Sequence, residues 1–213
     1  FVGHPLLDRA HDLPSREDAR AQLNLARDRP VLALFPGSRQ QEIDRHLDAF
    51  VETAQILESR LPGIQVVVSA ASTVTLDPAR CPYQRVESAS FTVLRAADAA
   101  LCKSGTTTLE AAIAECPLVV AYRTGLISFL LARLMVTIPH IGLVNVVAGR
   151  EVAREFVQDD LQPVDVSEAM MPLFDRNSPE CRRVLEGLAE VRGRLGTPGA
   201  AARVAAMASE LVP

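Results

Sequence analysis

The stretch that decides the fold reads LCKSGTTTLEAAIAECPLVV and spans residues 101–120. An apolar run at 97–102 predicts a strand that enters this stretch, and a second run at 117–121 predicts another strand. Between them, a loop of small residues, Ser104-Gly105-Thr106, leads into a helix. Such a loop presents backbone N–H groups and the positive end of a helix dipole, so this turn is suited to hold a phosphate group.

The same alternation of strand and helix runs through the chain before this turn. Residues 30–35 form a continuous apolar run, which is typical of a buried parallel strand, and the run stops at Pro36-Gly37-Ser38-Arg39. The pattern predicts an α/β fold, a Rossmann-like parallel sheet with helices on both faces. The elements predicted next are a helix at 42–61, strands at 64–69 and 85–87, and a helix at 90–97.

After residue 121 the sequence predicts mainly helices. The predicted elements are an apolar helix at 126–136, an extended segment at 141–147, and helices at 151–158, 166–174, 179–195 and 200–211. The apolar helix at 126–136 is too short to cross a bilayer. We interpret it as packing on another part of the protein, with contact to a membrane surface as the alternative.

These elements divide the chain into three parts. Residues 1–13 are predicted to be a linker strand, 14–177 a Rossmann-like domain, and 178–213 terminal helices that pack on a missing N-terminal domain or on a partner. The chain opens on Phe1-Val-Gly-His-Pro5, without an initiator Met or a signal-like apolar run, so we expect it to be a piece of a longer protein.

Composition restricts the class of protein. Hydrophobic residues make up 48% of the 213 residues, which is enough for a sizeable core. The 22 basic and 26 acidic residues give a net charge of −4 without a basic tail, so nucleic acid is not an expected partner. The four cysteines and four histidines lack metal-binding spacing, which predicts reduced core thiols in a cytosolic protein and no metal site.

Two loops carry most of the possible chemistry. The loops at 36–39 and 103–106 both follow predicted parallel strands, and open α/β sheets bind ligands at that edge. Arg39 can pair bidentately with a phosphate, or it can be a solvated residue at a helix start. Neither loop matches a Walker loop or a dinucleotide-binding Gly pattern.

Several polar residues allow two interpretations. Glu110 closes a possible capping box with Thr107, or it accepts hydrogen bonds from a ribose diol. Asn145, in an apolar segment, ties down a loop or faces a polar ligand. His46 is expected to be partly exposed in the middle of a helix. No catalytic triad or carboxylate pair is evident, so the residues alone predict a ligand-binding domain without an obvious catalytic base.

Six short motifs follow one another in a recognisable order. They are Phe1-Val-Gly-His-Pro5, Phe35-Pro-Gly-Ser-Arg39 with Glu42-Ile43, Lys103-Ser-Gly-Thr-Thr-Thr-Leu-Glu110, Val119-Val-Ala-Tyr-Arg123, Asn145-Val-Val-Ala-Gly-Arg150 and Glu155-Phe-Val-Gln158. In this order the chain resembles the lipid-A-disaccharide synthases, glycosyltransferase family 19, over nearly its whole length. Many members have Pro where Val144 stands, a departure that we expect to change the stiffness of the loop more than its chemistry.

The resemblance implies an activity for the parent protein. It implies the C-terminal, donor-binding domain of a GT-B fold, followed by C-terminal helices. The parent would be an inverting hexosyltransferase that moves 2,3-diacylglucosamine from its UDP conjugate to 2,3-diacylglucosamine 1-phosphate, forming lipid A disaccharide and UDP. No metal or other cofactor is implied. The lipid acceptor and the catalytic acid or base would belong to the missing N-terminal domain, so this chain alone would be inactive.

The resemblance also implies a location and a set of binding residues. The protein would be cytoplasmic and peripheral at the inner membrane, and a homodimer is a further possibility. The residues implied are Ser38 and Arg39 near the diphosphate, Ser104, Gly105 and Thr106 cradling it, Glu110 on the ribose, Ser90 and Phe91 near the uracil, and Asn145, Glu155 and Gln158 toward the donor sugar or its phosphates.

Two other functions remain open at this stage. One is a non-catalytic interaction module, in which the helix at 126–136 and the Ala-rich tail form a dimer surface. The other is a different UDP-sugar enzyme of the GT-B type, such as an epimerase.

Overall fold

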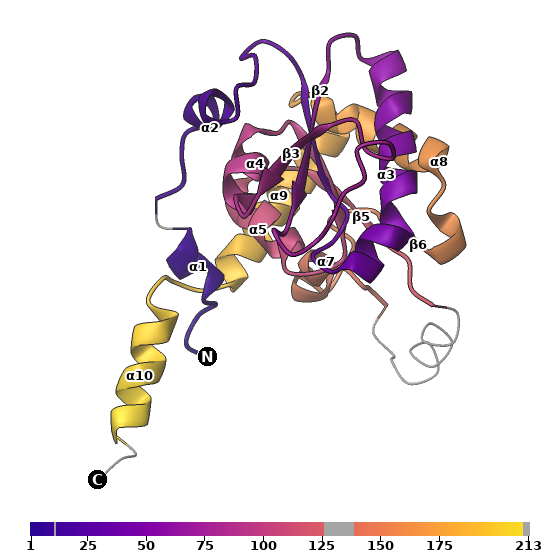
Figure 1. Cartoon of the computed structure of the whole chain (residues 1–213). Coiled ribbons are helices and arrows are strands. Elements are labelled where there is room, and N and C mark those ends of the chain that lie inside the picture. Colours follow the sequence, from indigo (N-terminus) through magenta and orange to yellow (C-terminus); the bar gives the residue numbers. More distant parts are fainter. Residues whose placement is uncertain (11, 126–138, 211–213) are drawn as a thin grey trace.

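A computed structural model of the chain describes residues 1–10, 12–125 and 139–210. Within these residues, one sheet of six parallel strands has the order β3-β2-β1-β4-β5-β6 (Figure 1). The strands are β1 (Val31–Phe35), β2 (Gln65–Ala70), β3 (Gln84–Glu87), β4 (Ala99–Lys103), β5 (Leu118–Tyr122) and β6 (Glu155–Val157). This order confirms the predicted Rossmann-like α/β fold.

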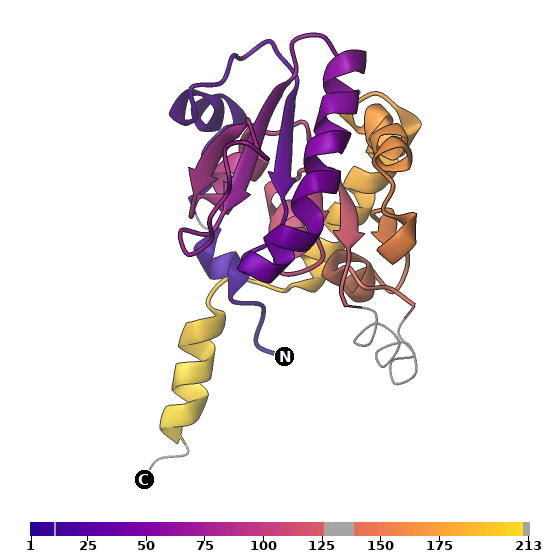
Figure 2. The ribbon, with the colours of Figure 1, turned by 45° about the vertical axis from the view of Figure 1, so that its right-hand side comes forward.

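Helices cover both faces of the sheet. The α-helices are α1 (Leu6–Arg9), α2 (Arg16–Gln22), α3 (Gln40–Arg60), α4 (Ser90–Ala96), α5 (Thr107–Ala114), α7 (Leu143–Ala148), α8 (Pro163–Met170), α9 (Pro179–Arg194) and α10 (Ala200–Glu210). Two 3₁₀ turns, η1 (Gln158–Asp160) and η2 (Met171–Phe174), flank α8. Helices α3 and α8 pack together on one side, and α4, α5, α7 and α9 form the layer on the other (Figure 2).

Strand burial explains why a parallel sheet forms. All five residues of β1 are buried, as are five of the six in β2, so these strands have apolar neighbours on both faces. Helix α3 presents Ile43, Leu47 and Phe50 to this core at helical spacing. The chain progresses outward from β1 to β3 and then returns to β4 beside β1, so the carboxyl ends of β1 and β4 flank a crevice.

Three predicted elements differ from the structure. Residues 141–147, expected to be extended, contain the helix α7, which buries Val144 and ends at Gly149 in the left-handed conformation. The helix expected at 151–158 is instead the strand β6 and the turn η1; β6 pairs with β5, where Val120 lies beside Glu155. A three-residue edge strand is too short to show an alternating pattern. The expected linker strand at 1–13 contains the short helix α1.

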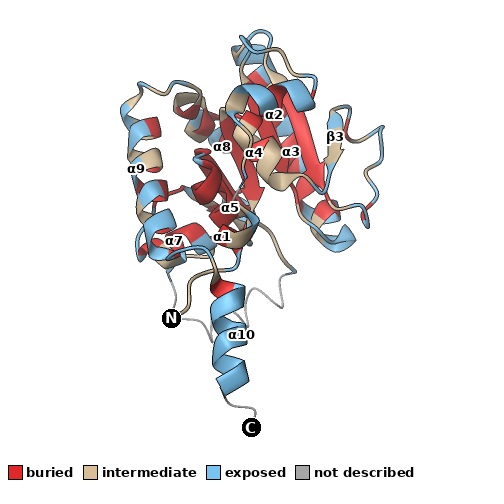
Figure 3. Cartoon of the chain, turned by 90° about the vertical axis from the view of Figure 1, so that its left-hand side faces the viewer, coloured by how far each residue is buried: buried red, intermediate tan, exposed pale blue. Residues whose placement is uncertain are grey.

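The two terminal helices behave differently. Helix α9 packs on α5 and α7, so it belongs to this domain rather than to a separate unit beginning at residue 178. Gly187 permits the segment after α7 to approach α9 closely, because a Cβ there would lie 2.5 Å from Cγ1 of Val152. Helix α10 projects from the body, and only Ala200 in it is buried (Figure 3). Packing of α10 on another domain or a partner stays a prediction.

Three further predictions concern the cysteines, the apolar helix at 126–136 and the membrane. All four cysteines are buried and free, in agreement with the predicted core thiols. The apolar helix predicted at 126–136 falls among the residues that the structure does not describe. In the described parts of the chain, no helix combines the length and the apolar character needed to span a membrane.

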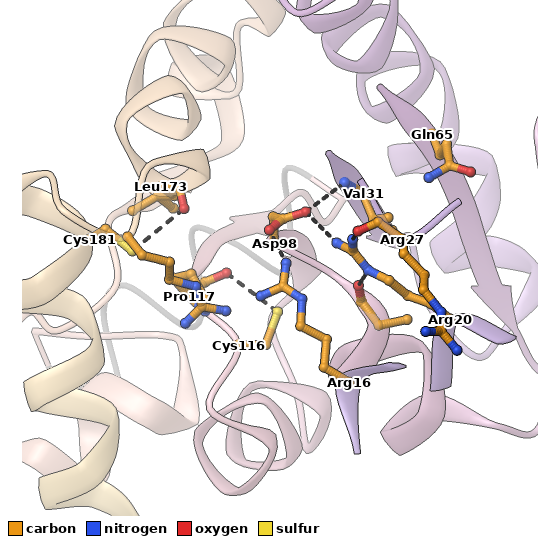
Figure 4. A network of polar contacts seen from close by, with 12 residues as sticks. Arg16, Arg20, Arg27, Val31, Gln65, Asp98, Cys116, Pro117, Leu173 and Cys181 are labelled. Atoms are coloured by element: carbon orange, nitrogen blue, oxygen red, sulfur yellow. Dashed lines mark hydrogen bonds and ion pairs between the residues drawn. The ribbon is translucent and has the colours of Figure 1, made fainter. Parts of the chain in front are cut away.

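A charged network closes the amino edge of the sheet. The Asp98 carboxylate, just before β4, accepts hydrogen bonds from Arg16, from Nη2 of Arg20 at 2.7 Å and from the N–H of Val31 at 2.8 Å (Figure 4). Arg20 also donates to the carbonyls of Ala96 and Arg27, at 2.9 and 2.5 Å. The network ties α2 to the first residue of β1, opposite to the edge where the two predicted loops lie.

Candidate functional site

A cleft of about 510 Å³ lies at the carboxyl edge of the sheet, where β1 and β4 end side by side. Its walls come from the segments that follow four neighbouring strands and from α1. The lining residues are Arg9, Phe35, Gly37, Ser38, Glu42, Ser69, Ala70, Ala71, Ser88, Ser90, Lys103, Ser104, Gly105, Thr106, Thr107 and Glu110. The structure therefore brings the two predicted loops into one site.

The first wall is the loop between β1 and α3. Glu42, in the first turn of α3, accepts a hydrogen bond from the N–H of Ser38 at 2.9 Å. Gly37 lies directly against this glutamate with φ at 142°, and a Cβ there would approach Cβ of Glu42 to 2.5 Å. Arg39 is not among the residues lining the cleft; its side chain is 81% exposed, with Nη1 3.2 Å from Oε1 of Glu42.

The carboxylate of Glu42 also reaches across to β4. Nζ of Lys103 donates to Oε1 of Glu42 at 2.9 Å and lies 5.8 Å from the centre of the Tyr122 ring. Burial opposes ionisation of Glu42, but the hydrogen bonds from Ser38 and Lys103 and the lysine charge outweigh it and lower its pKa to about 2. Glu42 is therefore an anion at neutral pH.

The second wall is the loop between β4 and α5. Ser104 is buried and held in place: its N–H donates to the carbonyl of Ala121 at 2.9 Å and its hydroxyl to the carbonyl of Ile141 at 2.7 Å. No acceptor among the described residues takes the N–H groups of Gly105, Thr106 and Thr107. Three backbone donors at the start of an eight-residue helix are thus available to a ligand in the cleft.

Glu110 lies on the first turn of α5 and its side chain is only 7% exposed. Helix α5 begins at Thr107, and no side chain caps it, so the capping-box interpretation of Glu110 is wrong. Its nearest charged partner is Arg9, whose Nη1 lies 3.6 Å from Oε1 of Glu110. Glu110 therefore lines the cleft without capping the helix, and its contact with a ribose diol stays a prediction.

The residues predicted near uracil lie in the first turn of helix α4, in agreement with the helix predicted at 90–97. Ser90 lines the cleft, and so does Ser88, which has φ at 54°. Phe91 is partly buried, and the Arg9 guanidinium lies 6.0 Å from the centre of its ring. The structure thus places Ser90 in the cleft and Phe91 next to it, beneath a cation that the sequence analysis did not consider.

Asn145 and Glu155 are hydrogen-bonded within the protein. The completely buried Asn145 donates from Nδ2 to the carbonyl of Ala153 and to Oε1 of Glu155, at 2.6 and 2.8 Å, and its Oδ1 accepts from the N–H groups of Val152 and Ala153. Glu155 additionally accepts from the N–H groups at 141 and 142, before α7. These bonds favour the loop-anchoring interpretation of Asn145.

Gln158 is also held by backbone partners. Its side-chain oxygen accepts from the N–H of Thr124 at 2.7 Å and its side-chain nitrogen donates to the carbonyl of Thr124 at 3.1 Å. Asn145, Glu155 and Gln158 are not among the residues lining the cleft. Contact of these three side chains with a donor sugar stays a prediction.

His46 differs from its expected partial exposure, because it is fully buried in α3. Nδ1 lies 2.7 Å from the carbonyl oxygen of Glu42, and Nε2 lies 2.8 Å from the N–H of Arg123. Since the carbonyl can only accept and the N–H can only donate, the ring carries its proton on Nδ1. Burial lowers the pKa of His46, so the neutral ring links the first cleft wall to the end of β5.

Comparison with solved structures defines the class of fold. WaaG, a glycosyltransferase involved in lipopolysaccharide biosynthesis, matches with a TM-score of 0.56 and 15% identity, over 89% of this chain and 50% of that chain. The spinosyn rhamnosyltransferase SpnG matches with a TM-score of 0.57 and 14% identity, over 92% and 48%. At such identities the likeness concerns the fold alone, and that fold is one Rossmann-like half of a GT-B glycosyltransferase.

Comparison of sequences gives the particular family. The family model for lipid-A-disaccharide synthetase matches residues 1–187. The lipid-A-disaccharide synthase of Myxococcus xanthus is 38% identical over 220 residues, and that of Syntrophus aciditrophicus 36% identical over 221; each match includes 100% of this chain and 57% of the relative. The chain belongs to the lipid-A-disaccharide synthetase family, and it spans about 57% of the length of these relatives.

Proposed function

We propose that the chain is the donor-binding half of an inverting glycosyltransferase. In this proposal the parent protein transfers 2,3-diacylglucosamine from UDP-2,3-diacylglucosamine to 2,3-diacylglucosamine 1-phosphate. The observation that carries the proposal is the set of N–H groups at Gly105, Thr106 and Thr107, which have no acceptor among the described residues and lie in a cleft that Glu110 also lines. Membership of the lipid-A-disaccharide synthetase family supports the choice of substrates. SpnG, of the same fold, is described in complex with thymidine diphosphate, another nucleoside diphosphate.

In the proposed reaction, the role of this chain is to stabilise the leaving group. The acceptor hydroxyl oxygen attacks the anomeric carbon from the face opposite to UDP. The bond from that carbon to the β-phosphate oxygen breaks, and its electron pair leaves with UDP. The amides of residues 105–107, the α5 dipole and the Arg39 guanidinium stabilise the growing negative charge. The proton of the hydroxyl goes to a base that we place outside this chain.

Binding of UDP to the chain tests this proposal directly. A ligand that binds only the folded state raises the melting temperature, and at 100 times its Kd it adds about 2.7 kcal/mol, or about 5–10 °C for a domain of this size. We expect Arg39→Ala to lose most of the shift. The matched control is Arg45→Ala, at an exposed position within α3, the helix that follows Arg39; this variant should keep the shift. The absence of a shift at millimolar UDP would contradict the proposal.

We also propose where the parent protein works. Both sugars carry acyl chains, which supports a protein that is cytoplasmic and bound peripherally at the inner membrane. Cosedimentation of the full-length parent with vesicles of phosphatidylethanolamine and phosphatidylglycerol tests this. Recovery of the protein in the supernatant, at low ionic strength, would contradict a peripheral location.

A homodimerisation module is the second candidate, and one observation favours it. Val204 and Met207, one helical turn apart on α10, are 52% and 56% exposed, so this helix offers two neighbouring apolar side chains to a partner. Light scattering of the chain with and without residues 196–213 tests this candidate. A monomer in both cases excludes it.

A further inference from the structure

One side chain in the cleft stands out in the sequence. Lys103 is the only lysine among the 22 basic residues of the chain, and the other 21 are arginine. The two residue types differ in chemistry: an ammonium is a compact point charge with three donors, whereas a guanidinium is a broad planar fork. The single ammonium is placed at the carboxyl end of β4, where it lines the cleft.

Three donors converge on the carboxylate beside this lysine. Glu42 accepts from the N–H of Ser38 at 2.9 Å, from Nζ of Lys103 at 2.9 Å and from Nη1 of Arg39 at 3.2 Å. The first donor belongs to the loop after β1 and the second to the end of β4. One internal carboxylate thus links both walls of the crevice, with its side chain only 14% exposed.

The ammonium also borders the unpaired amides. A Cβ built on Gly105 would lie 4.0 Å from Nζ of Lys103, so this nitrogen is adjacent to the start of the 105–107 loop. Glu42 is the hydrogen-bond acceptor that the described residues provide to Nζ. A lysine ammonium has three N–H donors, which leaves donors for a ligand that lies against the amides.

We propose that Lys103 is a diphosphate-binding residue and that Glu42 is its positioning residue, holding the ammonium against the amide loop. The inference rests on the proposed function and deepens it. A ligand phosphate would take the remaining donors of Nζ together with the N–H groups of residues 105–107. Glu42 would retain its hydrogen bonds to Ser38 and Lys103 and so keep the two cleft walls at a fixed separation. Arginine at position 103 would preserve the charge without the compact donor geometry.

The single lysine allows a test that leaves the protein unmodified. In protein grown on isotope-labelled lysine, only Lys103 carries the label, so its Cε and Nζ groups give one set of NMR signals. We expect UDP and inorganic pyrophosphate to shift these signals and uridine to leave them unchanged. Binding of UDP without a shift of the Lys103 signals would overturn the inference while leaving the proposed function intact.

Substitution gives a second readout. Lys103→Met leaves Glu42 without its ammonium partner and is expected to destabilise the fold, so the double variant Lys103→Met with Glu42→Gln removes both charges together. We expect the double variant to bind UDP at least about tenfold more weakly than the wild type, with Lys103→Arg intermediate and uridine affinity equal in all three. Equal UDP affinity in the double variant would overturn the inference.

Pyrophosphate separates this inference from the proposed function. If UDP fails to bind the wild type but pyrophosphate still shifts the Lys103 signals, the proposed function fails and the anion site stands. If neither ligand acts, both fail.

Discussion

The amino and carboxyl edges of the sheet both carry a carboxylate bound by basic side chains, but the two hydrogen-bond networks differ in how many donors find an acceptor. At the amino edge, Asp98 accepts from Arg16, Arg20 and the N–H of Val31, and Arg20 uses its other nitrogens on backbone carbonyls. At the carboxyl edge, Glu42 accepts from Lys103 and two residues of its own loop, while nearby N–H groups find no acceptor among the described residues. In the first network every side-chain nitrogen of Arg20 donates to an acceptor, whereas N–H groups beside the second network remain available to a ligand.

The residues that stabilise the fold and the groups that are free to bind a ligand thus lie at opposite edges of the sheet. A buried charge is costly unless its partners are complete, so the network around Asp98 fixes one geometry. Unused donors at a helix start cost less where water or a ligand reaches them, and a cleft provides that access. Substitutions at the two edges should therefore differ in what they damage.

Removal of the charge on Asp98 is the strongest test of the amino edge. Asp98→Asn leaves Arg20 buried without its carboxylate, and we expect a loss of about 3 kcal/mol or more in the free energy of unfolding. Urea denaturation followed by circular dichroism measures it. The matched control is Asp48→Asn, which breaks the exposed pair with Arg80 and should cost less than about 1 kcal/mol. Equal losses in both variants would show that the amino-edge network has no special role.

Acid titration tests the anion at the carboxyl edge. The pKa of Glu42 is about 2 in the folded protein, below the ordinary value of 4.5, so its contribution is complete above pH 4.5 and is lost as the pH falls toward 2. We expect a loss of at most about 3 kcal/mol over this interval, measured as unfolding free energy against pH. Glu42→Gln should flatten that part of the curve. An unchanged curve in the variant would contradict the assignment.

A Cβ at position 37 tests the first wall of the cleft. Gly37→Ala would place its Cβ 2.5 Å from that of Glu42, at a φ of 142° that alanine rarely adopts. We expect a destabilisation of about 2 kcal/mol and loss of the UDP-induced rise in melting temperature. The comparison variant is Gly193→Ala on α9, where no atom lies within 4 Å of the added Cβ; it should stabilise the helix by up to about 1 kcal/mol. A normal UDP response in Gly37→Ala would place the ligand elsewhere.

The smallest effect on stability is expected at Glu110. Because α5 has no side-chain cap, Glu110→Gln should change the free energy of unfolding by less than about 0.5 kcal/mol, whereas loss of a true cap costs about 1 kcal/mol. The same variant should reduce the preference of the protein for UDP over 2′-deoxy-UDP, measured by calorimetry. A full loss of about 1 kcal/mol with unchanged preference would restore the capping interpretation.

The sequence predicted most of the sheet and the place of the cleft. The strands β1, β4 and β5 contain apolar runs that stop at Pro36, Lys103 and Arg123, so their ends could be predicted locally. Contacts between distant segments could not. Arg9 reaches Glu110 across 101 positions, and His46 is buried because α3 packs beside the end of β5.

The wrong prediction of an extended segment at 141–147 also has a physical reason. Helix α7 has apolar residues on its exposed side as well, Leu143 and Val146, which hides the helical period. The hydrogen bonds of Asn145 and Glu155 depend on α7, because they hold the residue before this helix and the segment after it. The hydrogen bonds of these two side chains could therefore not be predicted without the helix, and their contact with a donor sugar stays a prediction.

The four buried thiols have a practical consequence for studying this protein. Burial raises the pKa of Cys116 to about 12 and that of Cys102 well above the ordinary value, so neither reacts with an alkylating reagent while the core is closed. Cys102 is in β4 itself, immediately before the lysine of the cleft, whereas Cys181 is in the first turn of α9. Mass spectrometry after timed alkylation would thus compare the rates at which Cys102 and Cys181 become labelled, and so report whether the sheet or the α9 layer opens first.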